Sequence, residues 1–208
     1  MTKYSGSEPI VAEPGSNPLD RYYKKRIDYR FKNESFAFHV AHTLFSSFEV
    51  DDGTDLLLRS ITVKSPQTVL DLGCGYGVLG IVLGRLWPEA QILMADKDLL
   101  AVRYARHNVQ ENQITNVKVI GSLGLEDVPE GPYDLIVSNI PAKIGDDAIE
   151  HEFILGPLES IRPGGDYWFV VVSGLNSLIP TISKRNNLKI KEIKKRSGYT
   201  VYHIHKPE

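Results

Sequence analysis

The sequence has few features of a secreted or membrane protein. It contains one cysteine, Cys74, so no internal disulfide can form. No apolar run approaches the roughly 20 residues that a membrane-spanning helix needs, and residues 1–20 lack the apolar block of a secretory signal. These absences exclude a disulfide-stapled scaffold and favour a cytoplasmic protein with no membrane partner.

Charge is nearly balanced overall but unevenly distributed. The net charge is −2, yet residues 21–32 have six Lys or Arg against one acid, and residues 181–208 have eight against two. Two basic ends around an acidic middle are typical of a surface that binds a polyanion such as RNA. They are also typical of edge strands that carry Lys against aggregation. Charge alone leaves both interpretations open.

The N-terminal third predicts a tail, a hairpin and a short helix. Residues 1–20 are rich in Pro, Gly, Ser and Glu without a period, which predicts a flexible tail. Loose alternation over 22–40, interrupted by turn residues at 32–34, predicts a hairpin. A short helix is predicted over 54–61, with Thr54 or Gly53 as its N-cap. We expect one domain over 21–208, in which 21–65 extends a core at 66–208.

From Thr68 onwards, predicted strands and helices alternate. Alternation of this kind predicts an α/β fold with a doubly wound, mostly parallel sheet of seven strands. A helix over 149–161 is expected to stop at Arg162-Pro163-Gly164-Gly165, because Pro and Gly do not continue a helix. A helix over 175–187 then leads to a closing hairpin around Ser197-Gly198. The predicted core strands are 68–72, 91–95, 117–120, 133–137 and 166–172, and the first two helices are 78–86 and 99–112.

A glycine-rich loop follows the first core strand. It runs from Asp71 through glycines at 73, 75 and 77 into a predicted helix. Glycines allow the sharp turn, and the helix N-terminus presents free N–H groups to a ligand. Asp96 ends the next strand, 21 residues after Gly75, where a carboxylate can accept both hydroxyls of a ribose. The loop therefore predicts a nucleotide-like cofactor.

Two cofactors fit this loop. Residues 75–80 match the G-x-G-x-x-G pattern of NAD enzymes. Asp71, however, suits an ammonium group better than a pyrophosphate, and Gly73 is an additional glycine that NAD loops do not require. The residues therefore favour S-adenosylmethionine (AdoMet) over NAD, which stays open as the alternative.

The stretch Leu70-Asp71-Leu72-Gly73-Cys74-Gly75-Tyr76-Gly77-Val78-Leu79-Gly80 resembles motif I of the "methyltransferase small domain" family of class I AdoMet-dependent methyltransferases. This family includes enzymes that methylate guanine N2 of ribosomal RNA. Phe45-Ser46-Ser47-Phe48, Asp51-Asp52-Gly53-Thr54 and Gly198-Tyr199-Thr200-Val201 are also similar, so the resemblance covers about 35–205. It implies AdoMet as cofactor and S-adenosylhomocysteine as product. The cofactor residues that it implies are Asp71, Gly73, Cys74, Gly75, Tyr76, Gly77, Asp96, Lys97, Ser122, Leu123 and Asn139.

A second motif follows the fourth core strand. Asn139-Ile140-Pro141-Ala142 stands where the family has Asn-Pro-Pro-aromatic. The resemblance implies that Asn139, Ile140 and Pro141 are catalytic: the Asn139 side-chain oxygen and the Ile140 carbonyl each accept an N–H and so aim the lone pair of the amine. Ala142 lacks the ring that stacks on a base. The aromatic residues that could replace it are Tyr29, Phe31, Phe36 and Phe45.

The expected activity is methyl transfer to guanine N2 of structured ribosomal RNA, bound through basic residues 21–32 and 184–196. Three other functions stay open: methylation of a small molecule or protein, a non-catalytic AdoMet-fold module that binds RNA or a partner, and an NAD enzyme. Cys74 is expected to be a small loop residue rather than a nucleophile, since no His lies near it in sequence. The six histidines show no metal-ligand spacing, so no metal site is expected.

Overall fold

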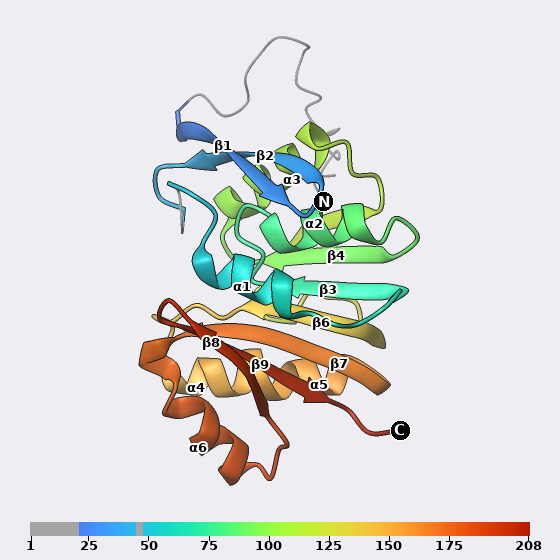
Figure 1. Cartoon of the computed structure of the whole chain (residues 1–208), viewed down its shortest axis with the longest axis vertical. Helices are drawn as coiled ribbons and strands as arrows, with labels where there is room; N and C mark the ends of the chain where they lie inside the picture. Colours follow the sequence, from blue (N-terminus) through green and yellow to red (C-terminus); the bar gives the residue numbers. More distant parts are fainter. Residues whose placement is uncertain (1–20, 45–47) are drawn as a thin grey trace, which may run out of the picture.

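The computed structural model describes residues 21–44 and 48–208, so the tail predicted over 1–20 lies outside the described residues. These residues form a two-stranded hairpin and a seven-stranded sheet, and the hairpin lies at one end of the molecule's long axis (Figure 1). Within the two described ranges, no helix is both long and apolar enough to cross a membrane.

The central sheet has the predicted doubly wound architecture. Its strand order is β5-β4-β3-β6-β7-β9-β8, and β9 runs antiparallel to both of its neighbours. The order reverses between β3 and β6, and ligands of doubly wound sheets bind beyond the carboxyl ends of the strands at such a point. The strands are β3 (Thr68–Leu72), β4 (Gln91–Asp96), β5 (Val117–Gly121), β6 (Tyr133–Asn139), β7 (Ile161–Val172), β8 (Lys191–Arg196) and β9 (Tyr199–His205).

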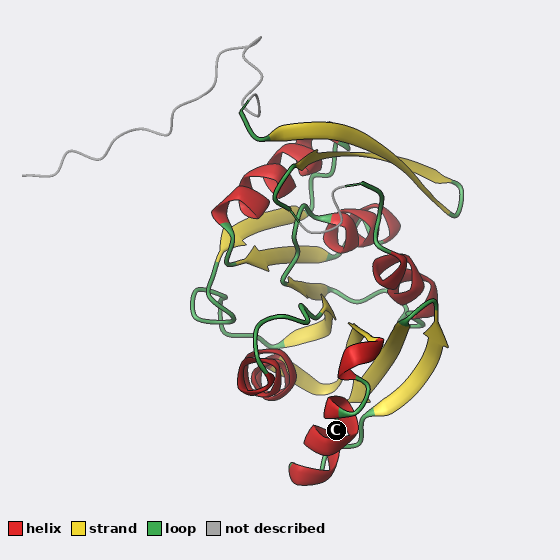
Figure 2. Cartoon of the chain, turned by 90° about the vertical axis from the view of Figure 1, so that its left-hand side faces the viewer, coloured by secondary structure: helices red, strands yellow, loops and turns green. Residues whose placement is uncertain are grey.

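Helices cover both faces of this sheet (Figure 2). Alternate strand residues face opposite sides, so Val69 and Leu135 pack on one face while Leu70 and Ile136 pack on the other. The first face is covered by α1 (Asp52–Ser60), α2 (Val78–Leu86) and α3 (Leu99–Glu111). The second face is covered by the helical segment 146–160 and by α6 (Leu178–Arg185).

The N-terminal hairpin consists of β1 (Tyr23–Phe31) and β2 (Glu34–Ala41), as predicted. It is fastened to α3 by two asparagine side chains. Asn108 Oδ1 accepts the His39 N–H at 2.7 Å, and its Nδ2 donates to the His39 carbonyl at 3.0 Å. Asn112 makes the same pair of bonds with the Ala37 backbone, at 2.9 and 2.7 Å. The helix thus pairs with β2 much as a neighbouring strand would.

The predicted start of the first helix is wrong. Asp51 caps α1 in place of Thr54 or Gly53, since its Oδ2 accepts the Thr54 N–H at 3.1 Å. The helix begins at Asp52, two residues before the predicted start, because an Asp side chain satisfies a free N–H group of the first turn.

The helix predicted over 149–161 also differs. It begins at α4 (Asp146–Ala148), continues as a π-helix, η1 (Ile149–Leu155), and ends as α5 (Gly156–Ser160). It ends one residue before the predicted end, and the segment 162–165, expected only to stop the helix, belongs to β7. Its backbone finds partners in the C-terminal segment, since the Gly164 N–H donates to the Lys206 carbonyl and the Lys206 N–H donates to the Gly165 carbonyl. The helix predicted from 175 starts later, at Leu178, after a 3₁₀ turn, η2 (Ser173–Leu175).

Candidate functional site

A cleft of about 530 Å³ opens at the carboxyl ends of β3, β4 and β6. Its volume lies in the range of about 300–1,000 Å³ that small-molecule sites occupy. Asp71, Gly77 and Leu123 are the predicted site residues that do not line it. The predicted residues that do line it are Gly73, Cys74, Gly75, Tyr76, Asp96, Lys97, Ser122, Asn139, Ile140 and Pro141.

The glycine loop is tied to β4 by its backbone. The N–H groups of Gly73 and Cys74 both donate to the Ala95 carbonyl, at 2.8 and 3.0 Å. Gly75 has a φ of +56°, and a Cβ there would meet nothing within 4 Å, so its backbone borders open space. Gly77, with a φ of +99°, lies behind the loop, where a Cβ would come within 3.1 Å of Ile81. Gly77 therefore serves packing, whereas Gly75 leaves room for a ligand.

Asp71 lies fully buried beneath the loop. Its Oδ2 accepts the Gly80 N–H at 2.8 Å, while its Oδ1 has no hydrogen-bond partner in the part of the chain that the structure describes. Burial raises the pKa of Asp71 to about 7, the charge of Asp96 adds to this rise, and the Gly80 bond opposes it. An unpartnered buried carboxylate oxygen is a place for a cationic ligand group or a proton.

Asp96 ends β4 with both carboxylate oxygens oriented by backbone groups. Oδ2 accepts the Gly75 N–H at 2.8 Å, and Oδ1 accepts the Asp98 N–H at 2.9 Å. Each oxygen keeps a further lone pair for a hydroxyl group. The carboxylate is therefore held where it can accept two neighbouring hydroxyls of a ribose.

The segment predicted to flank the adenine is only partly in the cleft. Ser122 Oγ donates to the Gly124 carbonyl and accepts the Asp127 N–H, both at 3.0 Å, so its hydroxyl holds its own loop together. Leu123 is 50% exposed and lies outside the cleft, whereas Gly124 lines it. The structure therefore does not bring Leu123 to the site.

Asn139 is the last residue of β6 and is held by side chains from α1 and its cap. Its Nδ2 donates to Asp51 Oδ2 at 2.8 Å and to Thr54 Oγ1 at 2.9 Å. Both amide hydrogens are thereby used, which leaves the side-chain oxygen Oδ1 as the group available to a ligand. Ile140 is buried, and its N–H donates to the Val170 carbonyl at 3.0 Å.

Cys74 is buried in the loop. Burial raises the pKa of its thiol well above the ordinary value, and the charges of Asp71 and Asp96 add to the rise. A thiol that stays protonated is a poor nucleophile, which agrees with the expectation of a small loop residue.

Comparison with known proteins places this arrangement in a family. The family model described as "Methyltransferase small domain" matches residues 35–203. The chain belongs to the methyltransferase small domain family. It is 37% identical over 150 residues to ribosomal RNA small subunit methyltransferase C of Haemophilus influenzae (strain Rd), which covers 71% of this chain and 44% of that protein. It is 29% identical to the uncharacterized protein YbxB of Bacillus subtilis, over 88% of this chain and 92% of that protein.

A solved structure of this family is also similar. The 16S rRNA N2 G1207 methyltransferase of T. thermophilus, in complex with AdoMet and guanosine, superposes with a TM-score of 0.77 at 25% identity. It covers 91% of this chain and 52% of that one. This chain thus spans about half the length, or less, of the ribosomal RNA methyltransferases that it matches. Membership of this family sets the NAD alternative aside.

The structure adds site residues that the family motifs alone did not mark. Asp51, Thr54 and Tyr199 meet around Asn139, although the sequence suggested only that their segments resembled the family. Phe153 of η1 lines the cleft, and its ring lies 3.4 Å from where a Cβ on Gly73 would stand. No local pattern identifies these residues, because each reaches the site from a distant part of the chain.

The aromatic residues proposed to replace the missing ring at Ala142 lie elsewhere. Tyr29, Phe31 and Phe36 are not among the residues that line the cleft, and their rings pack against one another in the hairpin. Tyr29 also donates to Asp55 Oδ1 at 2.7 Å. Phe45 lies outside the described residues. Among the described residues, the aromatic side chains that line the cleft are those of Tyr76 and Phe153.

Proposed function

We propose that this chain is an AdoMet-dependent methyltransferase that methylates an exocyclic amine, guanine N2, of ribosomal RNA. The observation that carries this proposal is the held amide of Asn139. Its Nδ2 is bonded to Asp51 and Thr54, so Oδ1 remains to accept an N–H of the incoming amine. The Ile140 carbonyl is proposed to accept the other N–H, and two acceptors together aim the lone pair.

The residues around the glycine loop fit AdoMet. The unpartnered Oδ1 of buried Asp71 offers a negative charge toward an ammonium group, and Asp96 offers two oxygens to a ribose. AdoMet supplies a methyl group that is already activated, so the protein needs to orient the amine and exclude water rather than provide a strong base. Phe153 and Tyr76 supply aromatic side chains to the lining of the cleft.

The basic segments 21–32 and 184–196 are proposed to contact the RNA backbone. The strands β1 and β8, which carry most of these residues, both contact α1. Arg59 of α1 is exposed, with its guanidinium 5.2 Å from the centroid of the Phe31 ring and paired with Asp55 at 2.7 Å. The surface from β1 across α1 to β8 is therefore a candidate for phosphate contacts.

The test is transfer of labelled methyl from AdoMet to total RNA, protein and metabolite fractions, followed by nucleoside analysis of any labelled RNA. The expected product is N2-methylguanosine from ribosomal RNA, and Asn139→Ala should reduce turnover at least about 100-fold while AdoMet binding stays near wild type. If label appeared only in the protein or metabolite fraction, the substrate would be a protein or a small molecule rather than RNA. No transfer to any fraction would favour a non-catalytic binding module.

A further inference from the structure

Two histidines and a glutamate lie together outside the cleft, where β2 meets α3. One ring nitrogen each of His39 and His107 and a carboxylate oxygen of Glu111 all lie within 4.8 Å of one another. The two rings meet edge to face with centroids 4.6 Å apart. His39 Nε2 is 3.8 Å from Glu111 Oε1, which is beyond hydrogen-bond length. Three potential metal ligands thus face one another without a hydrogen bond between His39 and Glu111.

His107 carries an unused nitrogen in this cluster. Its Nε2 is buried and has no hydrogen-bond partner within 21–44 and 48–208. A neutral imidazole has one ring nitrogen with a free lone pair, which can bind a metal ion. Buried polar atoms in native proteins nearly always have a partner. A buried nitrogen without a partner, on a ring that lies against a second imidazole and near a carboxylate, points to a ligand.

The backbone around the cluster is already fixed. Asn108 holds both the N–H and the carbonyl of His39, which ties this residue to α3. His107 and Glu111 are four residues apart on the same helix and therefore face the same side. Tetrahedral zinc with bonds of about 2.0–2.1 Å sets its ligand atoms roughly 3.3 Å apart. The three ligand atoms, now within 4.8 Å of one another, would have to draw together by at most about 1.5 Å to reach that spacing.

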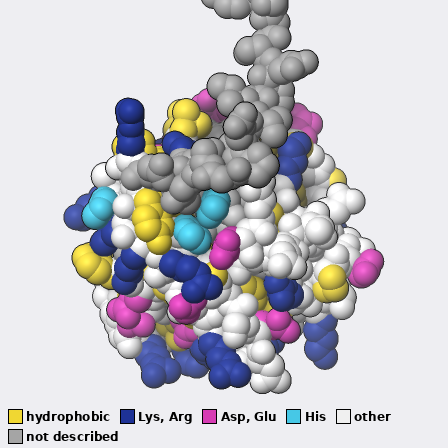
Figure 3. Space-filling model, turned by 90° about the horizontal axis from the view of Figure 1, so that it is seen from above, with side chains coloured by type: hydrophobic (Ala, Val, Ile, Leu, Met, Phe, Trp, Pro, Cys, Tyr) yellow, Lys and Arg dark blue, Asp and Glu magenta, His cyan; other side chains and the backbone are white. Residues whose placement is uncertain are grey.

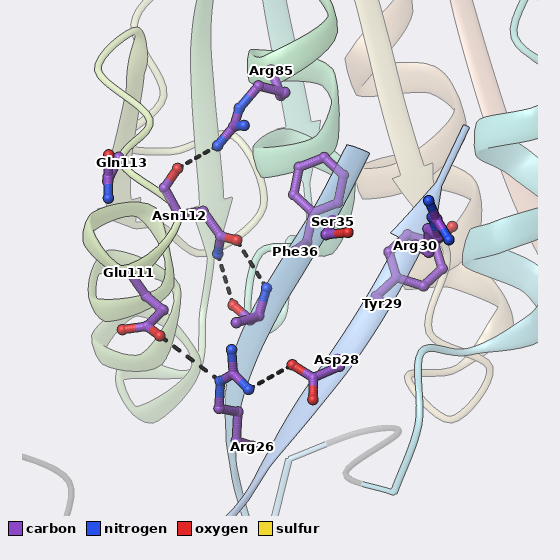
Figure 4. A pocket seen from close by; sticks show the side chains of 11 residues that line it. Arg26, Asp28, Tyr29, Arg30, Ser35, Phe36, Arg85, Glu111, Asn112 and Gln113 are labelled. Atoms are coloured by element: carbon purple, nitrogen blue, oxygen red, sulfur yellow. Dashed lines mark hydrogen bonds and ion pairs between the residues drawn. The ribbon is translucent and has the colours of Figure 1, made fainter. Parts of the chain in front are cut away.

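Charge near the cluster is compatible with a cation. Arg26 Nε lies 3.9 Å from Glu111 Oε1, but the same guanidinium is 2.6 Å from Asp28, so it lies between two acids (Figure 4). The side chain of Glu111 is 36% exposed, which gives an ion a path from solvent. The end of the molecule that carries the hairpin displays adjoining histidine side chains next to an acidic one (Figure 3).

We propose that His39, His107 and Glu111 bind one divalent transition-metal ion, preferably Zn²⁺, with the fourth coordination position open to water. Two imidazoles and a carboxylate are a donor set typical of zinc. Because His39 belongs to β2 and the other two ligands to α3, the ion would join the hairpin to the core. This site is separate from the cleft and does not depend on the proposed function.

The test uses the full chain without a histidine tag, stripped by a chelator and titrated with zinc chloride against a chromophoric competitor. One ion per chain should bind, and the melting temperature should rise with zinc concentration, since a ligand of the folded state stabilises it. Glu111→Gln and His107→Gln should each weaken zinc binding at least about tenfold, because even a partner of a metal ligand contributes 10–100-fold to affinity.

A matched control is available at the other end of the molecule's sheet. His203 Nε2 and His205 Nδ1 both contact Asp166 Oδ1, at 2.6 and 3.0 Å. His205→Gln should leave zinc binding unchanged. The proposal is overturned if the wild-type chain binds no zinc, if Glu111→Gln binds as tightly as wild type, or if His205→Gln abolishes binding. If His107→Gln fails to fold, zinc binding by the Glu111→Gln variant still decides the outcome, because Glu111 is exposed.

Discussion

Tyr199 Oη donates a 2.6 Å hydrogen bond to Asp51 Oδ1 across 148 positions of sequence. The other oxygen of Asp51 accepts from Asn139 Nδ2 at 2.8 Å. Gly53 permits this approach, since a Cβ there would lie 2.5 Å from the Tyr199 ring. Tyr199, the first residue of β9, therefore helps to orient the side-chain amide of Asn139 through Asp51.

Replacing Tyr199 with Phe should lower turnover about tenfold and leave AdoMet affinity unchanged. The variant loses one hydrogen bond to a carboxylate, which contributes about 1.5–3 kcal/mol, while the residues that line the cleft are unchanged. Burial, with the bond to Asp51, raises the pKa of Tyr199 to about 12, so the hydroxyl is a donor throughout the neutral range. Steady-state kinetics and calorimetry measure the two quantities.

Tyr202→Phe is the matched control for this prediction. Tyr202 lies on the same strand, but its ring stacks on Phe169 in the core of the opposite face. Equal losses of turnover in both variants would indicate a general effect on β9 rather than on Asn139.

Replacing Asp96 with Ala should weaken AdoMet binding by about 2–4 kcal/mol, because it removes charged acceptors from two hydroxyls. Asp96→Asn keeps one oxygen for the backbone N–H of Gly75 and should lose less. Calorimetric titration of both variants compares them. Wild-type affinity in Asp96→Ala would mean that this carboxylate does not bind the ribose.

Asp71 should make the unliganded protein less stable as pH rises. Its folded-state pKa, raised by burial to about 7, exceeds the ordinary 3.8, so the folded state retains a proton that the unfolded state releases. The contribution of Asp71 is therefore most favourable below about pH 4, declines up to pH 7 and is level above it. Urea unfolding of wild type and Asp71→Asn at pH 4.5, 6 and 8 isolates the contribution of Asp71 to the free energy of unfolding. The difference in free energy of unfolding between wild type and variant should change with pH by up to about 4 kcal/mol. A difference that stays constant over this pH range would contradict the raised pKa.

Replacing Lys24, Lys25 and Arg26 with Ala should reduce the salt dependence of RNA binding. Each phosphate contact contributes about 0.7–0.9 to the log–log slope, so the slope should fall by roughly two to three units. The lower figure applies if the 2.6 Å ion pair between Arg26 and Asp28 persists in the complex. AdoMet binding should not change. An unchanged slope would favour the alternative that these residues guard a strand edge.

Local sequence was sufficient to predict the strand, loop and helix that form one side of the cleft. The strand, the glycine loop and the following helix are adjacent in the chain, so their pattern predicts where N–H groups and Asp96 must lie. Asn139 was predicted from the resemblance to the family motif, and the structure places it at the end of β6, two residues beyond the predicted end of that strand. Leu123 shows the limit, because its side chain turns outward in a loop whose shape depends on Ser122 bonds.

Contacts between distant segments could not be predicted. Asp51, Asn139 and Tyr199 meet only because α1 packs on the sheet beside β6 and β9. His39 and His107 are 68 positions apart in sequence, so their spacing gives no metal-ligand pattern. The continuation of β7 through Pro163 and Gly164 likewise depends on pairing with Lys206, which overrides the local tendency to stop.

The two asparagines of α3 also link the hairpin to the glycine loop. Asn108 and Asn112 hold β2 by its backbone, whatever side chains the strand carries at these positions. Asn108 also donates to the Tyr76 carbonyl at 2.9 Å, within the cofactor loop. A single amide therefore connects the backbone of the hairpin with the backbone of the glycine loop, so replacing Asn108 would disturb both together.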